Sequence, residues 1–364
     1  MGNLLSYLSG LEEKNIVESL KEEKVPIVIW GAGQVALVIK KYLKEMQIPV
    51  ADIFVDDVYY TEELFLDKMQ VISKTKLLEK YQKVDVVIGY SDYQIADVLK
   101  KEEWVNEYFC FAYTAYGEFE KTPFKLVEKN INRYQAVYDM LADKKSKDVF
   151  VAFFQTKLSG NPKYTLQVFE RRMSYFDNDL YKIKNEEVYL DVGSAGGENV
   201  KLFIEESGGS YSYIYAVEPE AKLRGDLVEY VKRNNISRFE IASKGAWNMR
   251  GKIHFLYDGE SSHACAANDP GAGELQVELL DDMFDYKKKI TLLKVQYRDG
   301  VEEAILGAQK ILQEHKPKIA IMIGYGINNI YKIPLLIKKL NPDYKLYLRF
   351  NRGAAQTIVL YGLI

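Results

Sequence analysis

Apolar runs alternate with amphipathic stretches along most of this chain. The apolar residues from Val25 to Trp30 predict a buried strand, and apolar positions at helical spacing from Val35 to Met46 predict the helix that follows. Ile53 to Val55 indicate a second strand. Because a strand, a helix and a strand in this order form a βαβ unit, we expect the chain to begin with a Rossmann-like α/β domain.

The same alternation starts again near residue 188 and predicts a second Rossmann-like domain. Seven strands are expected, at Val188–Val192, Tyr213–Val217, Phe239–Ala242, Ile290–Val295, Ile319–Ile323, Leu346–Phe350 and Thr357–Leu360. Helical patterns lie between them, and a polar stretch with Trp247, His254, His263 and Cys265 interrupts the series. This order predicts a mainly parallel seven-stranded sheet with an antiparallel closing hairpin.

The length of 364 residues also favours more than one domain, because single domains commonly contain about 150 residues. We predict an amino-terminal Rossmann-like domain over residues 1–125, a helical connector over 126–185 and the second domain over 186–364.

The charge composition narrows the range of possible binding partners. The 49 basic and 52 acidic residues leave a net charge of -3, and no segment concentrates basic side chains enough to follow a phosphate backbone. Nucleic acid is therefore not an expected partner. Composition leaves homo-oligomerisation open.

Cysteine usage and hydropathy indicate the compartment. Cys110 and Cys265 fall in different predicted domains and lack metal-ligand spacing, so neither a disulfide nor a metal site is expected. No apolar run approaches the roughly 18 to 20 residues that span a bilayer, and the amino terminus does not resemble a signal peptide. These features predict a cytoplasmic protein without a membrane span.

A glycine-rich turn and an acid mark the start of the second domain. Asp191, Gly193, Ser194, Gly197 and Glu198 follow the first strand of that domain. Such a turn lets backbone approach a ligand closely, and the helix after it begins with free N–H groups.

Glu218 ends the next strand, where a carboxylate can accept hydrogen bonds from the two ribose hydroxyls of a nucleoside. The turn and the acid together predict a nucleoside-type pocket.

Several further blocks carry a family resemblance. They are Asp191-Val192-Gly193, Tyr215-Ala216-Val217-Glu218-Pro219, Lys244-Gly245-Ala246-Trp247, Gly251-Lys252-Ile253-His254-Phe255, Leu280-Asp281-Asp282, Leu293-Lys294-Val295, Glu303 to Ala308 and Lys316 to Ile321. In this order and spacing, the region 186–364 resembles FkbM-type O-methyltransferases. The resemblance implies a methyltransferase-type sheet, S-adenosyl-L-methionine (SAM) as cofactor, and methylation of a glycan or another small hydroxylated metabolite.

The chain departs from that family where catalysis is expected. The family block K-x-D-x-E-G-A-E is here Lys294-Val295-Gln296-Tyr297-Arg298-Asp299-Gly300-Val301, so Gln296 and Arg298 replace both acids. Methyl transfer to a hydroxyl requires a base for the acceptor proton. The enzyme is therefore expected to use another group, to hold an anionic substrate through Arg298, or to bind ligand without turnover.

Five residues are candidates for that group: Asp299, Glu302, His263, Lys294 and Tyr325, the last in the place of the family's usual histidine. Each has a structural alternative. Asp299 with Glu302 resembles a capping box at the start of a helix. His263 fits a surface loop, and Lys294 fits the end of a strand.

A second, weaker fingerprint lies in the amino-terminal domain. Gly31 and Gly33 precede Ala36 in a G-x-G-x-x-A turn, and Asp56 ends the next strand. This pattern is typical of domains that bind a nucleotide, a nucleotide-sugar or NAD(P). The alternative is that the glycines only let the helix pack closely on its strand.

Overall fold

The structure is a computed structural model that describes residues 4–9, 16–90, 96–111, 123–159, 163–169, 175–177, 179–257, 262–265, 267–269, 271–297, 299–350 and 357–364. Its contacts divide the chain into two compact units. Unit 1 comprises Met1–Asp139, Lys144–Arg171 and Arg352–Ile358, and unit 2 comprises Met140–Asp143, Arg172–Asn351 and Val359–Ile364. The segment predicted as a connector, 126–185, is divided between them, with most of it in unit 1.

Unit 1 contains a six-stranded sheet in the order β3-β4-β2-β1-β5-β6. Its strands are β1 (Ile27–Trp30), β2 (Asp52–Val55), β3 (Phe65–Leu66), β4 (Met69–Ser73), β5 (Val84–Ile88) and β6 (Val105–Cys110). The pairs are parallel except for the β3–β4 hairpin, which the sequence pattern did not predict.

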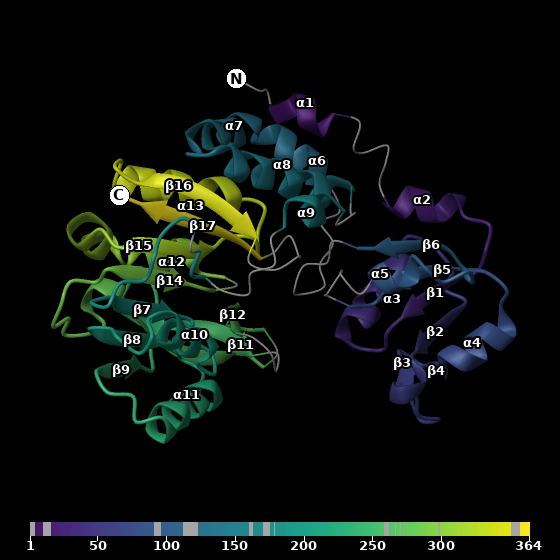
Figure 1. The fold of residues 1–364 in the computed structure, drawn as a ribbon, viewed down its shortest axis with the longest axis horizontal. Coiled ribbons are helices and arrows are strands. Elements are labelled where there is room, and N and C mark those ends of the chain that lie inside the picture. The colour runs from purple at the N-terminus through teal and green to yellow at the C-terminus, as the bar shows by residue number, and fades with distance from the viewer. Residues whose placement is uncertain are drawn as a thin grey trace. The chain divides into compact units, whose positions relative to one another are not determined.

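Helices cover both faces of this sheet (Figure 1). They are α2 (Ile16–Glu22), α3 (Gln34–Glu45), α4 (Lys74–Lys80) and α5 (Ala96–Leu99). Alternate residues of β1 enter two different core clusters: Ile29 packs with Ile39 of α3, and Val28 packs with Leu77 of α4. A strand buried on both sides has the continuous apolar run that its sequence shows.

Five further helices pack largely on one another, although Leu166 of the last one also contacts the core of this sheet. They are α1 (Leu4–Leu8), α6 (Pro123–Lys129), α7 (Ile131–Met140), α8 (Lys144–Ser159) and α9 (Lys163–Val168). An aromatic cluster joins α7 to α8: the ring of Phe154 lies 4.7 Å from that of Tyr134 and 5.1 Å from that of Phe150.

Unit 2 contains the predicted seven-stranded sheet, in the order β16-β17-β15-β14-β7-β8-β9. Its strands are β7 (Val188–Val192), β8 (Tyr213–Val217), β9 (Phe239–Ala242), β14 (Leu292–Val295), β15 (Lys318–Met322), β16 (Lys345–Phe350) and β17 (Ile358–Leu363). Strands β9, β8, β7, β14 and β15 pair in parallel, and β17 runs antiparallel to β15. The predicted fold class is confirmed.

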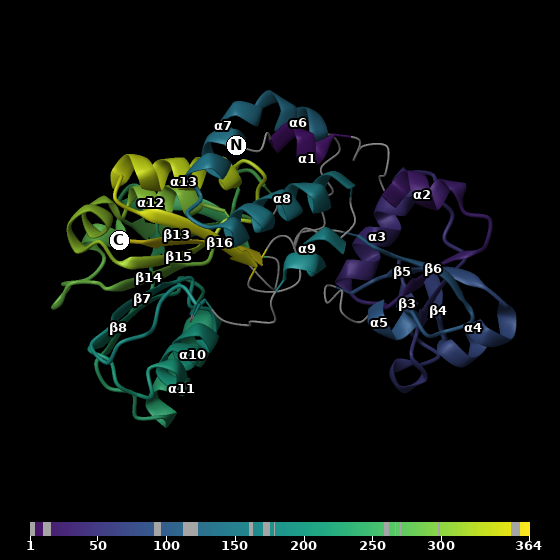
Figure 2. The ribbon, with the colours of Figure 1, turned by 45° about the horizontal axis from the view of Figure 1, so that its top comes forward.

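Helices lie on both faces of this sheet as well. They are α10 (Glu198–Glu206), α11 (Ala221–Arg233), α12 (Val301–Leu306) and α13 (Asn329–Leu340), with a short 3-10 helix at Leu280–Asp282 and a π-helical turn at Ile311–His315. Figure 2 shows α10 and α11 on one face and α12 and α13 on the other. Phe203 of α10 and Leu227 of α11 share a core cluster with Tyr189 of β7.

The polar stretch after β9 forms a second sheet, which the sequence pattern did not predict. Its order is β10-β13-β11-β12, and its strands are β10 (Gly245–Ala246), β11 (Gly251–Tyr257), β12 (Ser262–Ala264) and β13 (Gly273–Glu278). β11 pairs antiparallel with both β12 and β13.

The predicted capping box at Asp299 and Glu302 is wrong. The N-cap of α12 is Gly300, with φ 84° and no side-chain cap. Its left-handed backbone fits glycine, and a Cβ there would lie 2.2 Å from the Trp247 ring. Glu302 instead forms an ion pair with Lys332, at 2.9 Å.

Among the described residues, no helix combines the length and the apolar character that crossing a bilayer requires.

Candidate functional site

The loop after β7 has the backbone geometry of a close-approach turn. Gly193, Ala195 and Gly197 all have positive φ, of 75°, 48° and 101°, and Gly197 is the N-cap of α10. A Cβ at Gly193 would lie 2.2 Å from the backbone oxygen of Gln296, at the end of β14. Because no side chain fits at that distance, the loop requires glycine there.

A buried ion pair anchors this loop from beneath. Lys294 and Asp191 lie opposite each other in the β14–β7 register, their side chains are 0% exposed, and the lysine Nζ is 2.9 Å from the aspartate Oδ1. The same ammonium donates a hydrogen bond to the Gly193 carbonyl at 2.8 Å and lies 5.2 Å from the Tyr175 ring centre. Both side chains therefore hold the loop in place from inside the protein.

Glu218 meets the loop from the end of β8. Its Oε2 accepts a hydrogen bond from the Ala195 backbone N–H at 2.8 Å, and its Oε1 accepts one from the Glu220 N–H at 2.9 Å. The residue is 6% exposed. Burial raises the pKa of this carboxyl, while the two backbone hydrogen bonds act in the opposite direction. The loop and the acid thus meet at hydrogen-bonding distance.

Tyr297 extends across the same region, and sequence reasoning did not single it out. Its ring carbon Cδ1 lies 3.2 Å from the position that a Cβ on Gly193 would take. Its hydroxyl accepts a hydrogen bond from the Ala246 N–H at 3.2 Å. Burial raises the pKa of Tyr297, and the charges of Glu218 and Asp191 raise it further. The sequence gives one indication of this role, which is the position of Tyr297 just beyond the carboxyl end of a parallel strand.

The remaining candidates take different places. The Ser194 side chain is buried and donates to the Asp191 carbonyl at 2.8 Å, so it stabilises the turn. Glu198 is exposed in the first turn of α10. Tyr325 packs against a cluster that includes Met322 of β15. Asp299 precedes the N-cap of α12.

Two sequence-predicted residues lie wholly or partly outside the described residues. Arg298 lies outside the described residues, and so does the side chain of His263, whose backbone belongs to β12. Gln296 is described: its side-chain oxygen accepts a hydrogen bond from the Asn199 amide of α10 at 3.4 Å.

Gly31 and Asp56 of the amino-terminal fingerprint have protein partners. A Cβ at Gly31, which has φ 117°, would lie 3.0 Å from the Tyr90 ring, so this glycine lets a ring pack against the turn. Gly33 is the N-cap of α3. The Asp56 carboxylate accepts a hydrogen bond from the indole N–H of Trp30 at 3.2 Å. The ring packing explains why a glycine stands at position 31, and the indole N–H gives the Asp56 carboxylate a hydrogen-bond partner within the protein.

The strand order of unit 2, with its glycine turn after β7 and its acid after β8, defines a methyltransferase-type Rossmann-like fold. The chain is similar in fold to a solved structure of the methyltransferase FkbM from Methylobacillus flagellatus KT, with 18% identity and a TM-score of 0.76 over 99% of this chain and 98% of that one. The resemblance to FkbM-type methyltransferases is thereby confirmed for the fold.

Two other solved structures match about half of the chain. An rRNA methylase from Streptococcus thermophilus has 17% identity and a TM-score of 0.31 over 50% of this chain and 90% of that one. A SAM-dependent methyltransferase from Aquifex aeolicus has 12% identity and a TM-score of 0.31 over 56% of this chain and 97% of that one. TM-scores this low do not establish a shared fold. No family model matches the sequence, and no curated protein matches it.

Proposed function

We propose that unit 2 binds SAM and transfers its methyl group to a hydroxyl of a glycan or another small hydroxylated metabolite. The observation that carries the proposal is the hydrogen bond of 2.8 Å between Glu218 and Ala195, which brings the strand-end acid and the glycine turn together. SAM supplies the electrophilic methyl group when it is bound.

Different residues of the chain would bind different parts of the cofactor. In this proposal Glu218 accepts hydrogen bonds from the ribose hydroxyls, since each ionised carboxylate oxygen can accept more than one. The backbone from Gly193 to Gly197 and the first turn of α10, with Glu198, hold the methionine end. Lys294 and Asp191 keep the turn in position and do not touch the ligand.

The proton of the acceptor hydroxyl needs a base. Lys294 is an unsuitable one, because its ammonium is 0% exposed and already engaged with Asp191 and the Gly193 carbonyl. Asp299, Tyr325 and His263 stay the candidates for the catalytic group.

A second candidate function is ligand binding without methyl transfer. Gln296 stands where the resemblance implies an acid, and its amide is bonded to Asn199. An amide neither removes a proton nor binds a hard cation strongly, so this substitution favours the binding-only alternative.

Calorimetry with SAM and with S-adenosylhomocysteine tests the binding step on the full chain. We expect both to bind, and Glu218→Ala to weaken binding at least tenfold. Glu205→Ala is a matched control, because Glu205 is an exposed acid on α10. An absence of heat with both ligands would end the methyltransferase proposal.

Turnover distinguishes the two functions. We expect the double variant Gln296→Asp, Arg298→Glu to raise SAM hydrolysis or methyl transfer above the wild-type rate, measured as S-adenosylhomocysteine release. If the wild-type protein already methylates an acceptor rapidly, the binding-only alternative fails.

A further inference from the structure

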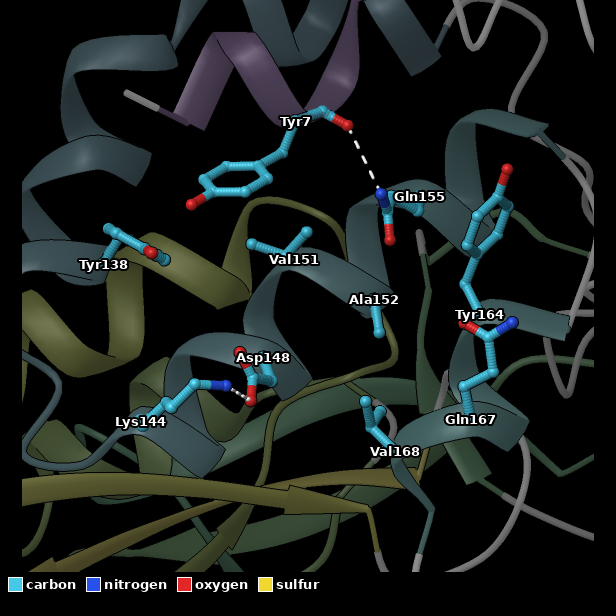
Figure 3. Close-up of a pocket in the computed structure, with 10 residues that line it drawn as sticks. All are labelled: Tyr7, Tyr138, Lys144, Asp148, Val151, Ala152, Gln155, Tyr164, Gln167 and Val168. Carbon is cyan, nitrogen blue, oxygen red and sulfur yellow. Dashed lines mark hydrogen bonds and ion pairs between the residues drawn. The ribbon is translucent and has the colours of Figure 1, made fainter. Parts of the chain in front are cut away.

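A cavity of about 310 Å³ lies in unit 1, between α1, α7, α8 and α9. This volume is at the lower end of the range found for small-molecule pockets. Figure 3 shows Tyr7 and Tyr164 on either side of Gln155, with Val151 and Ala152 from α8 between and below them. None of these residues belongs to the Gly193 loop or to Glu218, so the cavity is a separate site.

Hydrogen bonds between the helices fix the walls of this cavity. The Gln155 amide donates to the Tyr7 carbonyl at 3.3 Å and so joins α8 to α1. The hydroxyls of Thr156 and Thr165, both 0% exposed, lie 2.7 Å apart and join α8 to α9. Walls held this way lose little freedom when a ligand binds, which favours affinity.

The lining combines flat rings with hydroxyl and amide groups. Tyr7, Tyr138 and Tyr164 each offer an apolar ring edge or face together with a phenolic hydroxyl. Gln155 and Gln167 add amides, which both donate and accept hydrogen bonds. Burial raises the pKa of Tyr138, and Tyr7 raises it further, so this hydroxyl stays a donor at neutral pH.

The charges that line the cavity cancel. Lys144 and Asp148 form an ion pair at 2.7 Å, so the lining has one positive and one negative side chain. Two further ammonium groups lie against ring faces, Lys163 at 4.9 Å from the Tyr164 centre and Lys147 at 5.3 Å from the Tyr138 centre. Asp148 neutralises Lys144, and the other two ammonium groups lie outside the lining, so a neutral ligand needs no charged partner in the cavity itself.

We propose that this cavity binds a neutral carbohydrate, with one hexose-sized ring against the tyrosines that line it. A sugar ring matches both the aromatic rings and the polar groups of the lining. Its C–H face packs on aromatic rings, and its hydroxyls exchange hydrogen bonds with phenols and amides. The proposal does not depend on the methyltransferase function of unit 2.

Saturation-transfer NMR and calorimetry on the full chain, with the methyl glycosides of glucose, galactose, mannose and N-acetylglucosamine, test this site. We expect at least one to bind saturably, with a Kd on the order of 1 mM, as is reasonable for one small ring. Tyr164→Ala should weaken that binding about tenfold. Gln167→Ala, at an exposed position, should weaken it about threefold.

Tyr59→Ala is the control, because this tyrosine is 69% exposed and lies outside the cavity. It should leave sugar binding unchanged. The proposal is overturned if none of the four glycosides binds, if only glucose 6-phosphate or glucuronate binds, or if binding is insensitive to both cavity variants. SAM binding, measured in parallel, should be the same in all variants. A failure of the carbohydrate proposal can therefore be distinguished from a failure of the proposed function.

Discussion

Replacing Lys294 by methionine removes the charge beneath the Gly193 turn while keeping a long side chain. Asp191 would then stay buried, at 0% exposure, without the ammonium that now lies 2.9 Å from its Oδ1. The carboxylate of Glu218 is close enough to Asp191 for the two charges to repel. Lys294→Met should therefore destabilise unit 2 through an uncompensated buried charge.

The expected loss is large for a single substitution. Removing one partner of a buried ion pair costs about 3 to 5 kcal/mol, and a unit of this size loses roughly 2 to 4 °C of Tm for each kcal/mol. Lys252→Met is the matched control, because its ion pair with Glu274 has a similar distance of 2.7 Å but side chains that are 54% and 57% exposed. Breaking that pair should change stability by less than about 1 kcal/mol.

Urea denaturation measures both free energies of unfolding, and hydrogen exchange in β7 and β14 shows whether the loss is local to the turn. A double variant, Asp191→Asn with Lys294→Met, removes both charges and should recover most of the stability lost in Lys294→Met. The reasoning is refuted if Lys294→Met is no more destabilising than Lys252→Met, or if the double variant is the least stable of the set.

Three further predictions concern the same site. Gly193→Ala should cost at least about 2 kcal/mol more than Gly209→Ala in urea denaturation, since both glycines have φ near 75° but only Gly193 has an atom 2.2 Å from its Cβ position; equal costs would contradict the close approach. Tyr297→Phe leaves the buried Ala246 N–H without its acceptor, so it should lower the free energy of unfolding by about 1 to 3 kcal/mol in the same assay. An unchanged stability would contradict this hydrogen bond. Because the ionised form of Glu218 accepts ribose hydroxyls best and burial raises its pKa, SAM affinity should increase as pH rises through that pKa and then level off, whereas calorimetry of Glu218→Gln should show weak binding without this rise.

Much of the main sheet of unit 2 could be predicted because its strands are mainly apolar runs. β8 and β9 begin and end at the predicted residues. The four-stranded sheet could not be predicted, since one face of β11 and β13 is lined by charged side chains such as Lys252 and Glu274. Lys and Glu have a low β-propensity, so these strands give a weaker signal than the apolar strands of the main sheet, although alternation is itself a strand pattern.

The site was predictable only where local pattern determines it. Gly193 and Glu218 stand at strand ends next to turns, so their place could be inferred from the elements alone. The Lys294–Asp191 pair depends on the register of β14 against β7, two strands that are far apart in the sequence. A register between distant strands has no local signal, which is why both residues were interpreted singly, one as a catalytic candidate and the other as a cofactor ligand.

In the proposed function, binding and chemistry would depend on different atoms of the same segment. Gly193 approaches the backbone oxygen of Gln296, so the turn keeps its shape whatever side chain stands at position 296. The ion pair that holds the turn lies two residues earlier, at Lys294, and on the neighbouring strand. A substitution of the motif acid can therefore change proton transfer while the turn and Glu218 stay in place. Gln296→Ala should accordingly leave the SAM Kd within about threefold of wild type; a loss as large as that of Glu218→Ala would show that the side chain itself forms the pocket.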